Sequence, residues 1–294
     1  MRVLIFGANG QVGREAVQLA PALEMTPLPA TRSEIDLTDA SAIAAFIKAR
    51  NCQAVLNAAA YTAVDKAETE PVLARQINAE VPKAIAQACA ELGIPLVHYS
   101  TDYVFDGTGA EPYVETDPTA PLGVYGETKL AGEQAILATD ATAAIIRLSW
   151  VFSTHGQNFV KTMLRLGRER DTLRVVADQT GKPTPAKDAA FAGLTALQAL
   201  SQTPGLSGIY HYAGDTRTTW AEFARAIFEA ADMPTCVDAI TTADYPTPAI
   251  RPAWSVLDTA KFETAFGLQS ADWRSALHGV IEELQAEQDE EGVP

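Results

Sequence analysis

Residues 2–13 read Arg-Val-Leu-Ile-Phe-Gly-Ala-Asn-Gly-Gln-Val-Gly, and this stretch decides the fold prediction. Arg2–Phe6 is a short, mostly apolar run typical of a buried strand, and Gln11–Leu23 has the pattern of a helix. The loop between them holds three glycines: Gly7, Gly10 and Gly13. Glycines let the backbone turn sharply and approach a phosphate, and the helix N-terminus offers free N–H groups. The spacing is G-x-x-G-x-x-G, which is weak evidence alone, but the strand before it and the helix after it favour a dinucleotide site over a simple turn.

Outward from this stretch, the first 150 residues alternate apolar runs with alanine-rich amphipathic stretches, the pattern of βαβ units. Strands are expected at Arg2–Phe6, Met25–Ala30, Ala54–Ala58, Pro95–Ser100 and Ala143–Leu148, and helices at Gln11–Leu23, Ala40–Arg50, Val72–Leu92 and Tyr125–Ala138. After Trp150 the rhythm loosens, with helices expected at Asn158–Arg168, Lys187–Leu200, Trp220–Ala231, Thr259–Phe266 and Trp273–Gln285 and strands at Leu173–Val176 and Gly208–Tyr212.

This order predicts an α/β fold: a doubly wound, parallel, Rossmann-type sheet with a smaller substrate-binding lobe. Residues 1–150 and about 173–213 are expected to form the nucleotide-binding domain. Residues of about 151–172 and 214–294 are expected to form the lobe. In open α/β sheets ligands bind beyond the carboxyl ends of the strands, so the chemistry is expected there.

Composition excludes several classes of protein. A chain of 294 residues buries a substantial core without disulfides or structural metal. Its formal net charge of −15 repels a phosphate backbone, so we expect no nucleic acid partner. No segment resembles a signal peptide or a membrane span, which predicts a cytoplasmic protein without a membrane partner. The free cysteines and the four histidines show no metal-ligand spacing and are expected to be structural: Cys52, Cys89, Cys236, His98, His155, His211 and His278.

Two further segments bear on the cofactor. An acidic residue about 20 positions past the glycines usually holds the ribose of NAD, whereas an arginine there favours the 2′-phosphate of NADP. Arg32 follows the second strand, so NADPH is predicted and NADH remains possible; the alternative for Arg32 is a solvated loop arginine. Asp36, beside Leu37, either hydrogen-bonds the adenine or caps the next helix. The small residues of Asn57–Thr62 either let a flat cofactor lie close or pack tightly at a strand end.

Three residues form a possible catalytic group: Thr101, Tyr125 and Lys129. Pro95–Ser100 continues into Thr101, and Tyr125 and Lys129 lie one turn apart on a single helical face. Ketone reduction by hydride requires an acid with a pKa near the working pH, and a tyrosine near 10 needs about 4 kcal/mol of phenolate stabilisation to fall by about 3 units. A lysine ammonium and an oxidised nicotinamide both act in that direction, and Thr101 can donate to the substrate oxygen. The alternative is an ordinary helix start.

Longer strings support a family resemblance. They are GANGQVG from residue 7, NAAAYTAVDKAE from 57, HYSTDYVFDG from 98, YGETKLAGE from 125, RLSWVF from 147 and RPAWSVLD from 251. The chain resembles the extended short-chain dehydrogenase/reductases and, among them, the dTDP-4-dehydrorhamnose reductases. The resemblance implies NAD(P)H-dependent reduction of the C4 ketone of dTDP-4-dehydro-6-deoxy-L-mannose to dTDP-L-rhamnose. It makes Tyr125 the proton donor, Lys129 its pKa-lowering and ribose-binding partner, and Thr101 the residue that orients the substrate.

The resemblance also implies a set of binding residues. Trp150 would pack on the sugar, with a core tryptophan as the alternative, and Arg251 would pair with the diphosphate, with a surface salt bridge as the alternative. Asn158 either shapes the sugar pocket or is loop structure. The predicted cofactor-binding residues are Gly7, Asn9, Gly10, Gln11, Val12, Gly13, Arg32, Asp36, Leu37, Ala58, Ala59, Ala60, Tyr61, Thr62, Ser100, Tyr125 and Lys129. The predicted substrate-binding residues are Thr101, Asp102, Tyr103, Val104, Phe105, Trp150, Asn158 and Arg251.

Alternatives within the same fold stay open. A 4,6-dehydratase needs an Asp-Glu pair after the strand-end threonine, but here Asp102 is followed by Tyr103. A non-catalytic subunit, like the regulatory beta subunit of methionine adenosyltransferase, shares the fold, but the intact Thr101, Tyr125 and Lys129 favour the enzyme. Some members are dimers bridged by Mg²⁺, and Glu15 lies at a comparable place. Its partner carboxylates are not identifiable from sequence, so a homodimer is possible and no metal ligand is predicted.

Overall fold

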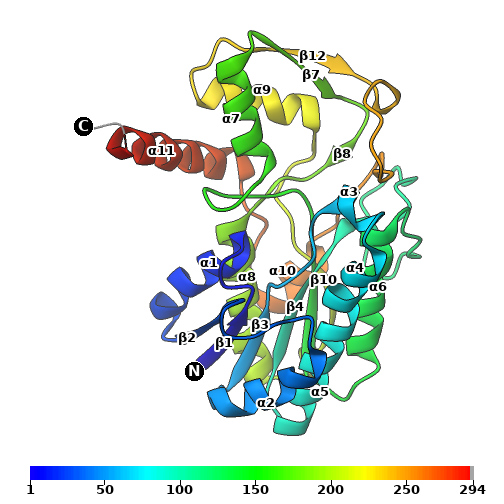
Figure 1. The fold of residues 1–294 in the computed structure, drawn as a ribbon, viewed down its shortest axis with the longest axis vertical. Helices are drawn as coiled ribbons and strands as arrows, with labels where there is room; N and C mark the ends of the chain where they lie inside the picture. Colours follow the sequence, from blue (N-terminus) through cyan, green and yellow to red (C-terminus); the bar gives the residue numbers. More distant parts are fainter. Residues whose placement is uncertain (292–294) are drawn as a thin grey trace.

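The computed structural model describes residues 1–291, with side chains to residue 287, and is built around one six-stranded sheet (Figure 1). The strands lie in the order β10-β5-β4-β3-β1-β2, and every pair is parallel. Their bounds are β1 (Arg2–Phe6), β2 (Thr26–Ala30), β3 (Ala54–Asn57), β4 (Leu96–Thr101), β5 (Ala143–Leu148) and β10 (Gly208–His211). The direction of winding reverses at β1, between β2 and β3, which places the expected binding crevice at the carboxyl ends of β1 and β3.

Helices cover both faces of this sheet (Figure 1). Side chains alternate along β1, so that Val3 and Ile5 enter one apolar core while Leu4 and Phe6 enter the other. The helices around the two cores are α1 (Gln11–Leu19), α8 (Ala186–Gln202) and α10 (Ala260–Phe266) on one face, and α2 (Ala40–Arg50), α5 (Val81–Leu92) and α6 (Val124–Leu137) on the other. The predicted doubly wound parallel α/β fold is confirmed.

Two helices differ from their predicted bounds because of prolines. The helix expected at Val72–Leu92 is divided into α4 (Pro71–Arg75), a π-helical turn (Gln76–Glu80) and α5. Pro82 has no N–H to donate, so a regular α-helical ladder cannot pass through it. The helix expected at Gln11–Leu23 becomes a 3₁₀ turn after Leu19, where Pro21 lies in the first turn of that segment.

The remaining elements form a second part with its own apolar core, at the top of Figure 1. They include α7 (Phe159–Glu169), α9 (Trp220–Ala230), α11 (Trp273–Glu291) and the parallel pair β7 (Thr172–Val176) and β12 (Cys236–Ile240). Two short strand pairs are β6 (Val151–Phe152) with β9 (Thr184–Pro185) and β8 (Thr180–Gly181) with β11 (Thr218–Thr219). The short helix α3 (Val64–Ala67) lies instead beside the sheet, against α4 and α6. Three further 3₁₀ turns lie at Asp102–Val104, Pro204–Leu206 and Thr242–Asp244.

The predicted division of the chain stays a prediction, but two contacts differ from its limits. β7, expected with the sheet, pairs instead with β12, an exposed strand that the sequence analysis did not anticipate. Phe262 of α10, expected in the lobe, lies in a core of the sheet.

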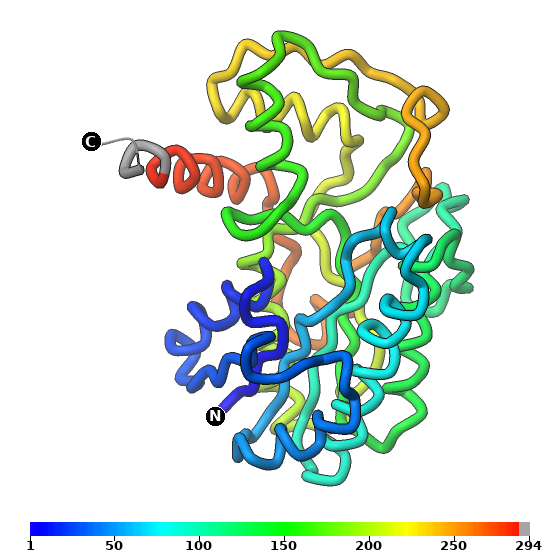
Figure 2. Tube along the Cα trace, in the orientation of Figure 1, coloured from blue at the N-terminus to red at the C-terminus, as the bar shows by residue number. Residues whose placement is uncertain are grey.

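The trace passes repeatedly between the two parts (Figure 2). One connection, drawn in orange, runs from β12 down to the sheet's carboxyl edge, where Trp254 N–H donates to the Gly107 carbonyl and Tyr113 N–H to that of Val256. Among the described residues, no helix is long and apolar enough to cross a membrane.

Candidate active site

The glycine loop after β1 is tightly folded. Gly7 has φ +74°, and a Cβ there would lie 2.6 Å from the Ala59 backbone nitrogen at the end of β3. A Cβ on Gly13 would lie 2.1 Å from the Gly7 carbonyl oxygen. Gly10, the N-cap of α1, offers no side chain to the first N–H groups of the helix. The loop therefore brings a helix N-terminus against two strand ends with room for a phosphate, the fit expected of a dinucleotide cofactor.

Gln11 connects this loop to the second part of the molecule. Its Oε1 accepts hydrogen bonds from Ser153 Oγ at 3.1 Å and from Asn158 Nδ2 at 3.0 Å. Asn158 also caps α7, because its Oδ1 accepts from Lys161 N–H at 3.1 Å. The side chain of Asn158 thus acts in loop structure here, which was the alternative to its predicted contact with the sugar.

The predicted ribose and adenine contacts lie near the ends of β2 and β3. Arg32 is exposed just beyond β2. Asp36 accepts from the N–H and the hydroxyl of Thr38, and these bonds lower the pKa of the Asp36 carboxyl. Past β3, the Tyr61 N–H donates to Asn78 Oδ1 at 2.8 Å, which fixes the alanine-rich segment before it. The other predicted contacts occupy the same two strand ends: Leu37, Ala58, Ala60 and Thr62.

Thr101, Tyr125 and Lys129 meet at the carboxyl end of β4. Thr101 ends the strand, and its hydroxyl donates to Asp102 Oδ1 at 3.0 Å. The ring of Tyr125 packs edge-on against Tyr103 with centroids 5.5 Å apart. Lys129 lies one turn further along α6, only 1% exposed, with Nζ donating to the Tyr99 carbonyl at 2.6 Å. The structure therefore joins Tyr125 to Thr101 by a side-chain hydrogen bond and holds Lys129, one turn along the same helix, against β4.

Close approach of α6 depends on Gly126. A Cβ at this position would lie 2.2 Å from the Tyr103 carbonyl oxygen. Glu68 Oε1 accepts from the N–H of Val124 at 2.9 Å and so binds the first turn of the helix. In β4, the buried Ser100 hydroxyl has no hydrogen-bond partner among the described residues, which is unusual for a buried polar group.

Burial dominates the electrostatics of this group. It raises the pKa of Tyr125 to about 12, against a hydrogen bond with Thr101, and a charge on Asp102 acts in the same upward direction. The sequence predicts a lowered pKa for Tyr125, because a lysine ammonium favours the phenolate. In the structure, loss of water around the phenol disfavours the phenolate more strongly. Burial also lowers the pKa of Lys129 to about 8 and raises that of Asp102 to about 6.

Two residues that were predicted to contact the substrate, Trp150 and Arg251, contact other side chains of the protein. Trp150, with φ +48°, stacks on Trp220 at a centroid distance of 3.6 Å. Arg251 forms a two-bond ion pair with Asp65, with Nη1 3.1 Å from Oδ1 and Nη2 2.8 Å from Oδ2. The salt bridge, offered as the alternative for Arg251, is present and fastens the late connection to α3.

Val104 and Phe105 lie away from the surface. Both are fully buried, and the Phe105 ring stacks on Tyr113 at 4.1 Å. Of the string after Thr101, Asp102 and Tyr103 adjoin the catalytic group, whereas Val104 and Phe105 support the turn beneath it.

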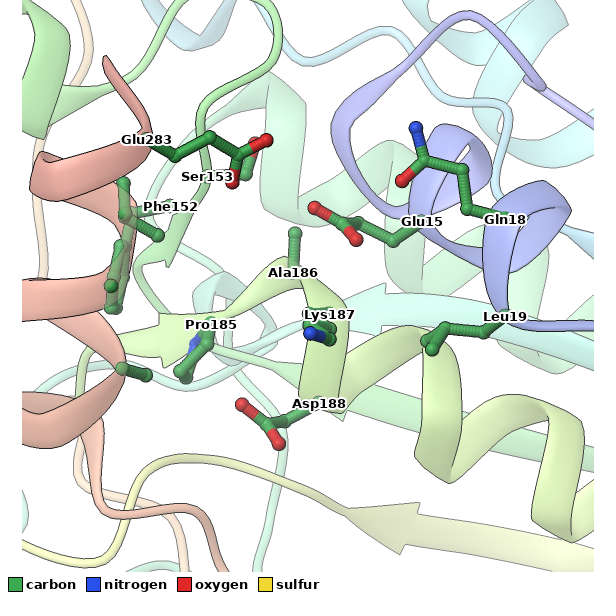
Figure 3. Close-up of a pocket in the computed structure, with 13 residues that line it drawn as sticks. Glu15, Gln18, Leu19, Phe152, Ser153, Pro185, Ala186, Lys187, Asp188 and Glu283 are labelled. Carbon is green, nitrogen blue, oxygen red and sulfur yellow. The ribbon is translucent and has the colours of Figure 1, made fainter. Parts of the chain in front are cut away.

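Glu15 lines a cavity that also contains two other carboxylates. Figure 3 shows Glu15 of α1, Asp188 of α8 and Glu283 of α11 around a cavity of about 450 Å³. Burial raises the pKa of Glu15, the charges of Glu283 and Asp188 act in the same direction, and that of His155 opposes it. Within residues 1–291, no three His, Cys, Asp or Glu side chains are grouped closely enough to hold a metal ion.

Comparisons with known proteins agree with this geometry. A family model described as the RmlD substrate binding domain matches residues 1–286. Relatives named dTDP-4-dehydrorhamnose reductase, from Shigella flexneri and from Escherichia coli strain K12, are each 43% identical over 293 residues, which cover 97% of this chain and 98% of the relative.

Solved structures give the same result. A dTDP-4-dehydrorhamnose reductase from Clostridium acetobutylicum has a TM-score of 0.91 and 37% identity, covering 97% of this chain and all of its own. One from Bacillus anthracis, in complex with NADP, has a TM-score of 0.89 and 36% identity, covering 96% and 99%. A UDP-glucose 4-epimerase from Thermus thermophilus, 20% identical with a TM-score of 0.81, covers 97% and 99% and shares the fold.

Proposed function

This chain belongs to the family of dTDP-4-dehydrorhamnose reductases, and we propose that it reduces the C4 ketone of dTDP-4-dehydro-6-deoxy-L-mannose to dTDP-L-rhamnose. The observation that carries this proposal is the meeting of Thr101, Tyr125 and Lys129 at the end of β4, beside a glycine loop shaped for a dinucleotide. A nicotinamide cofactor, when bound, supplies the hydride.

Three side chains of the protein bind and protonate the substrate oxygen. Tyr125 gives its proton to the developing C4 oxyanion, and Thr101 donates a hydrogen bond that orients the same oxygen. The charged form of Lys129, one helical turn from Tyr125, favours the phenolate that proton donation leaves behind. The small residues Ala58 to Ala60 that follow β3 would admit a flat cofactor ring.

We propose NADPH as the preferred cofactor. Arg32 is exposed at the end of β2, where a 2′-phosphate would lie. The nearby carboxylate of Glu34 is already engaged by the Thr31 N–H and by Arg50. The NADP complex of the Bacillus anthracis relative supports this choice.

We also propose that the dTDP-sugar lies between the carboxyl edge of the sheet and the second part of the chain. Residues 1–150 with about 173–213 would bind the nucleotide cofactor, and residues of about 151–172 and 214–294 would bind the sugar nucleotide. We propose that Trp150 and Arg251 contact the sugar nucleotide. Asp65 of α3 holds the guanidinium of Arg251 in place. The family resemblance leaves a homodimer possible, and we propose no metal ligand at Glu15.

Absorbance at 340 nm tests the function directly. Purified protein is mixed with the 4-dehydro sugar nucleotide generated in situ and with NADPH or NADH in parallel. Cofactor loss that requires the sugar nucleotide, with dTDP-L-rhamnose as product, is the expected result. A protein that binds NADPH but consumes neither cofactor would contradict the proposal and favour the non-catalytic subunit.

A further inference from the structure

Behind the active-site lysine lies a chain of three buried polar side chains. Asn57 ends β3, His98 stands opposite it on β4, and Lys129 reaches the same place from α6. Asn57 Nδ2 is 2.9 Å from His98 Nδ1, and His98 Nε2 is 3.3 Å from Lys129 Nζ. None of the three is more than 1% exposed, so water does not compete for these hydrogen bonds.

The orientation of Asn57 fixes the tautomer of His98. Asn57 Oδ1 accepts the backbone N–H of Ala59 at 3.1 Å, so the amide oxygen faces the backbone and the NH₂ group faces the histidine. An amide NH₂ only donates, which makes Nδ1 of His98 the acceptor. A neutral imidazole carries a single N–H, and here it must lie on Nε2.

The Nε2–H of His98 points at Lys129, and this determines which form of the amine fits. An ammonium group has only donors, whereas an uncharged amine has a lone pair that can accept this N–H. The uncharged amine still donates to the Tyr99 carbonyl. All hydrogen bonds among Asn57, His98 and Lys129 are therefore satisfied when the Lys129 amine is uncharged. When it is charged, the ammonium and the His98 Nε2–H are two donors that face each other.

Other charges around Lys129 do not reverse this preference. Glu133, on the same helix, favours the ammonium, but Arg147 of β5 holds its carboxylate through bonds of 2.9 and 2.7 Å. His98 cannot become the cation instead, because burial and Lys129 hold its pKa well below the usual range. Tyr125, on the same helix, is a neutral phenol because burial raises its pKa to about 12, and the Tyr99 phenol lies on the other face of the sheet, where it donates to the Ala189 carbonyl.

We propose that His98, with its tautomer fixed by Asn57, is a positioning residue that stabilises the uncharged form of Lys129. The role in turnover rests on the proposed reductase function. A proton is transferred most effectively by a group that titrates near the working pH, so this chain allows Lys129 to lose and regain its proton beside Tyr125 between turnovers. The sequence analysis assigned His98 a structural role only.

The first test needs neither substrate nor cofactor. Long-range ¹H–¹⁵N NMR of the histidine rings in the wild-type protein reports the tautomer, and loss of a signal in His98→Gln assigns it. The expected pattern is a protonated Nε2 and an acceptor Nδ1. An Nδ1–H tautomer for His98 would overturn the proposal.

The second test titrates the lysine amine by NMR of ¹⁵N-labelled lysine, with Lys129→Met to assign the signal. His98→Leu is expected to raise the pKa of Lys129 by about one unit, a tenfold larger ratio of ammonium to uncharged amine, because the donor to its lone pair is lost. Asn57→Asp is expected to raise it as well, since a second oxygen acceptor draws the hydrogen to Nδ1 and leaves Nε2 to accept from the ammonium. An unchanged or lowered pKa of Lys129 in His98→Leu overturns the proposal.

His211→Leu is the matched control, because His211 is equally buried in the same sheet and contacts Arg147 rather than Lys129. It is expected to lose stability without moving the Lys129 titration. In turnover, His98→Leu is expected to lower kcat and move its alkaline limb up by about one pH unit, with KM for NADPH within about twofold of wild type. If the wild type shows the tautomer and titration but no reduction, the proposed function fails while the assignment of His98 and Lys129 stands.

Discussion

Tyr125 differs from phenylalanine by one oxygen atom, and the proposed chemistry depends on the proton that this atom carries. Tyr125→Phe is expected to reduce kcat by about 10²- to 10⁴-fold, the usual contribution of a general acid. The ring packs edge-on against Tyr103 in either case, so NADPH affinity is expected to stay within about twofold of wild type. Stopped-flow absorbance at 340 nm measures the rate, and quenching of protein fluorescence measures the affinity. Near-normal kcat would remove Tyr125 from the role of proton donor.

Arg32 allows a test of cofactor choice because it is exposed and its removal leaves no cavity. Arg32→Ser is expected to raise KM for NADPH about tenfold, which corresponds to about 1.4 kcal/mol for one charge-assisted contact with a phosphate. KM for NADH is expected to change little, since NADH has no 2′-phosphate. Parallel kinetics with both cofactors measure the ratio. An equal change for both would show that Arg32 acts on the loop and not on the phosphate.

Between α6 and β5 lies the buried ion pair of Glu133 and Arg147, with side chains only 1% and 2% exposed. Glu133→Gln leaves the guanidinium with no countercharge in this pair, so the free energy of unfolding is expected to fall by about 3 kcal/mol or more. Glu91→Gln, in the exposed pair with Lys48, is the control and is expected to cost less than about 1 kcal/mol. Urea denaturation of both variants measures the difference, and equal losses would contradict the argument.

Elements with local signals were predictable from sequence, and those that depend on distant partners were not. β1, the glycine loop and the start of α6 follow from apolar runs, glycines and the one-turn spacing of Tyr125 and Lys129. β12 has an exposed burial pattern and is a strand only because β7 lies beside it. The Arg251–Asp65 pair joins residues 186 positions apart, and no pattern near either residue indicates the other.

The same limit applies to the active site. The strings around Asn57 and His98 were visible, but their hydrogen bond depends on the parallel register that sets Asn57 opposite His98. Likewise, Val104 and Phe105 were counted with the substrate contacts because they follow Thr101 in sequence. The chain turns inward after Asp102, so proximity along the sequence did not place these side chains at the surface.

For the molecule as a whole, the buried histidines set the acid limit of stability. His211 Nδ1–H donates to the Tyr113 carbonyl at 3.0 Å, and its Nε2 faces Arg147 at 3.3 Å, so the folded protein holds the ring neutral. Burial and Arg147 lower the pKa of His211 to about 3, and His98 is also held well below its usual value. The unfolded chain protonates both rings near pH 6.5 and therefore binds more protons than the folded chain between that pH and about 3.

Stability is accordingly expected to fall as the pH drops below 6.5, by about 2 kcal/mol for each of these histidines at pH 5. His211→Asn removes a ring that the folded protein holds neutral. The variant is expected to be less stable than wild type at pH 8, but its free energy of unfolding should fall by about 2 kcal/mol less between pH 7 and pH 5. His278→Asn, on the surface of α11, is the control and should leave the slope unchanged. Urea midpoints at a series of pH values give the slope directly. Equal losses of unfolding free energy between pH 7 and pH 5 in His211→Asn and in the wild type would mean that His211 takes up its proton in the folded state.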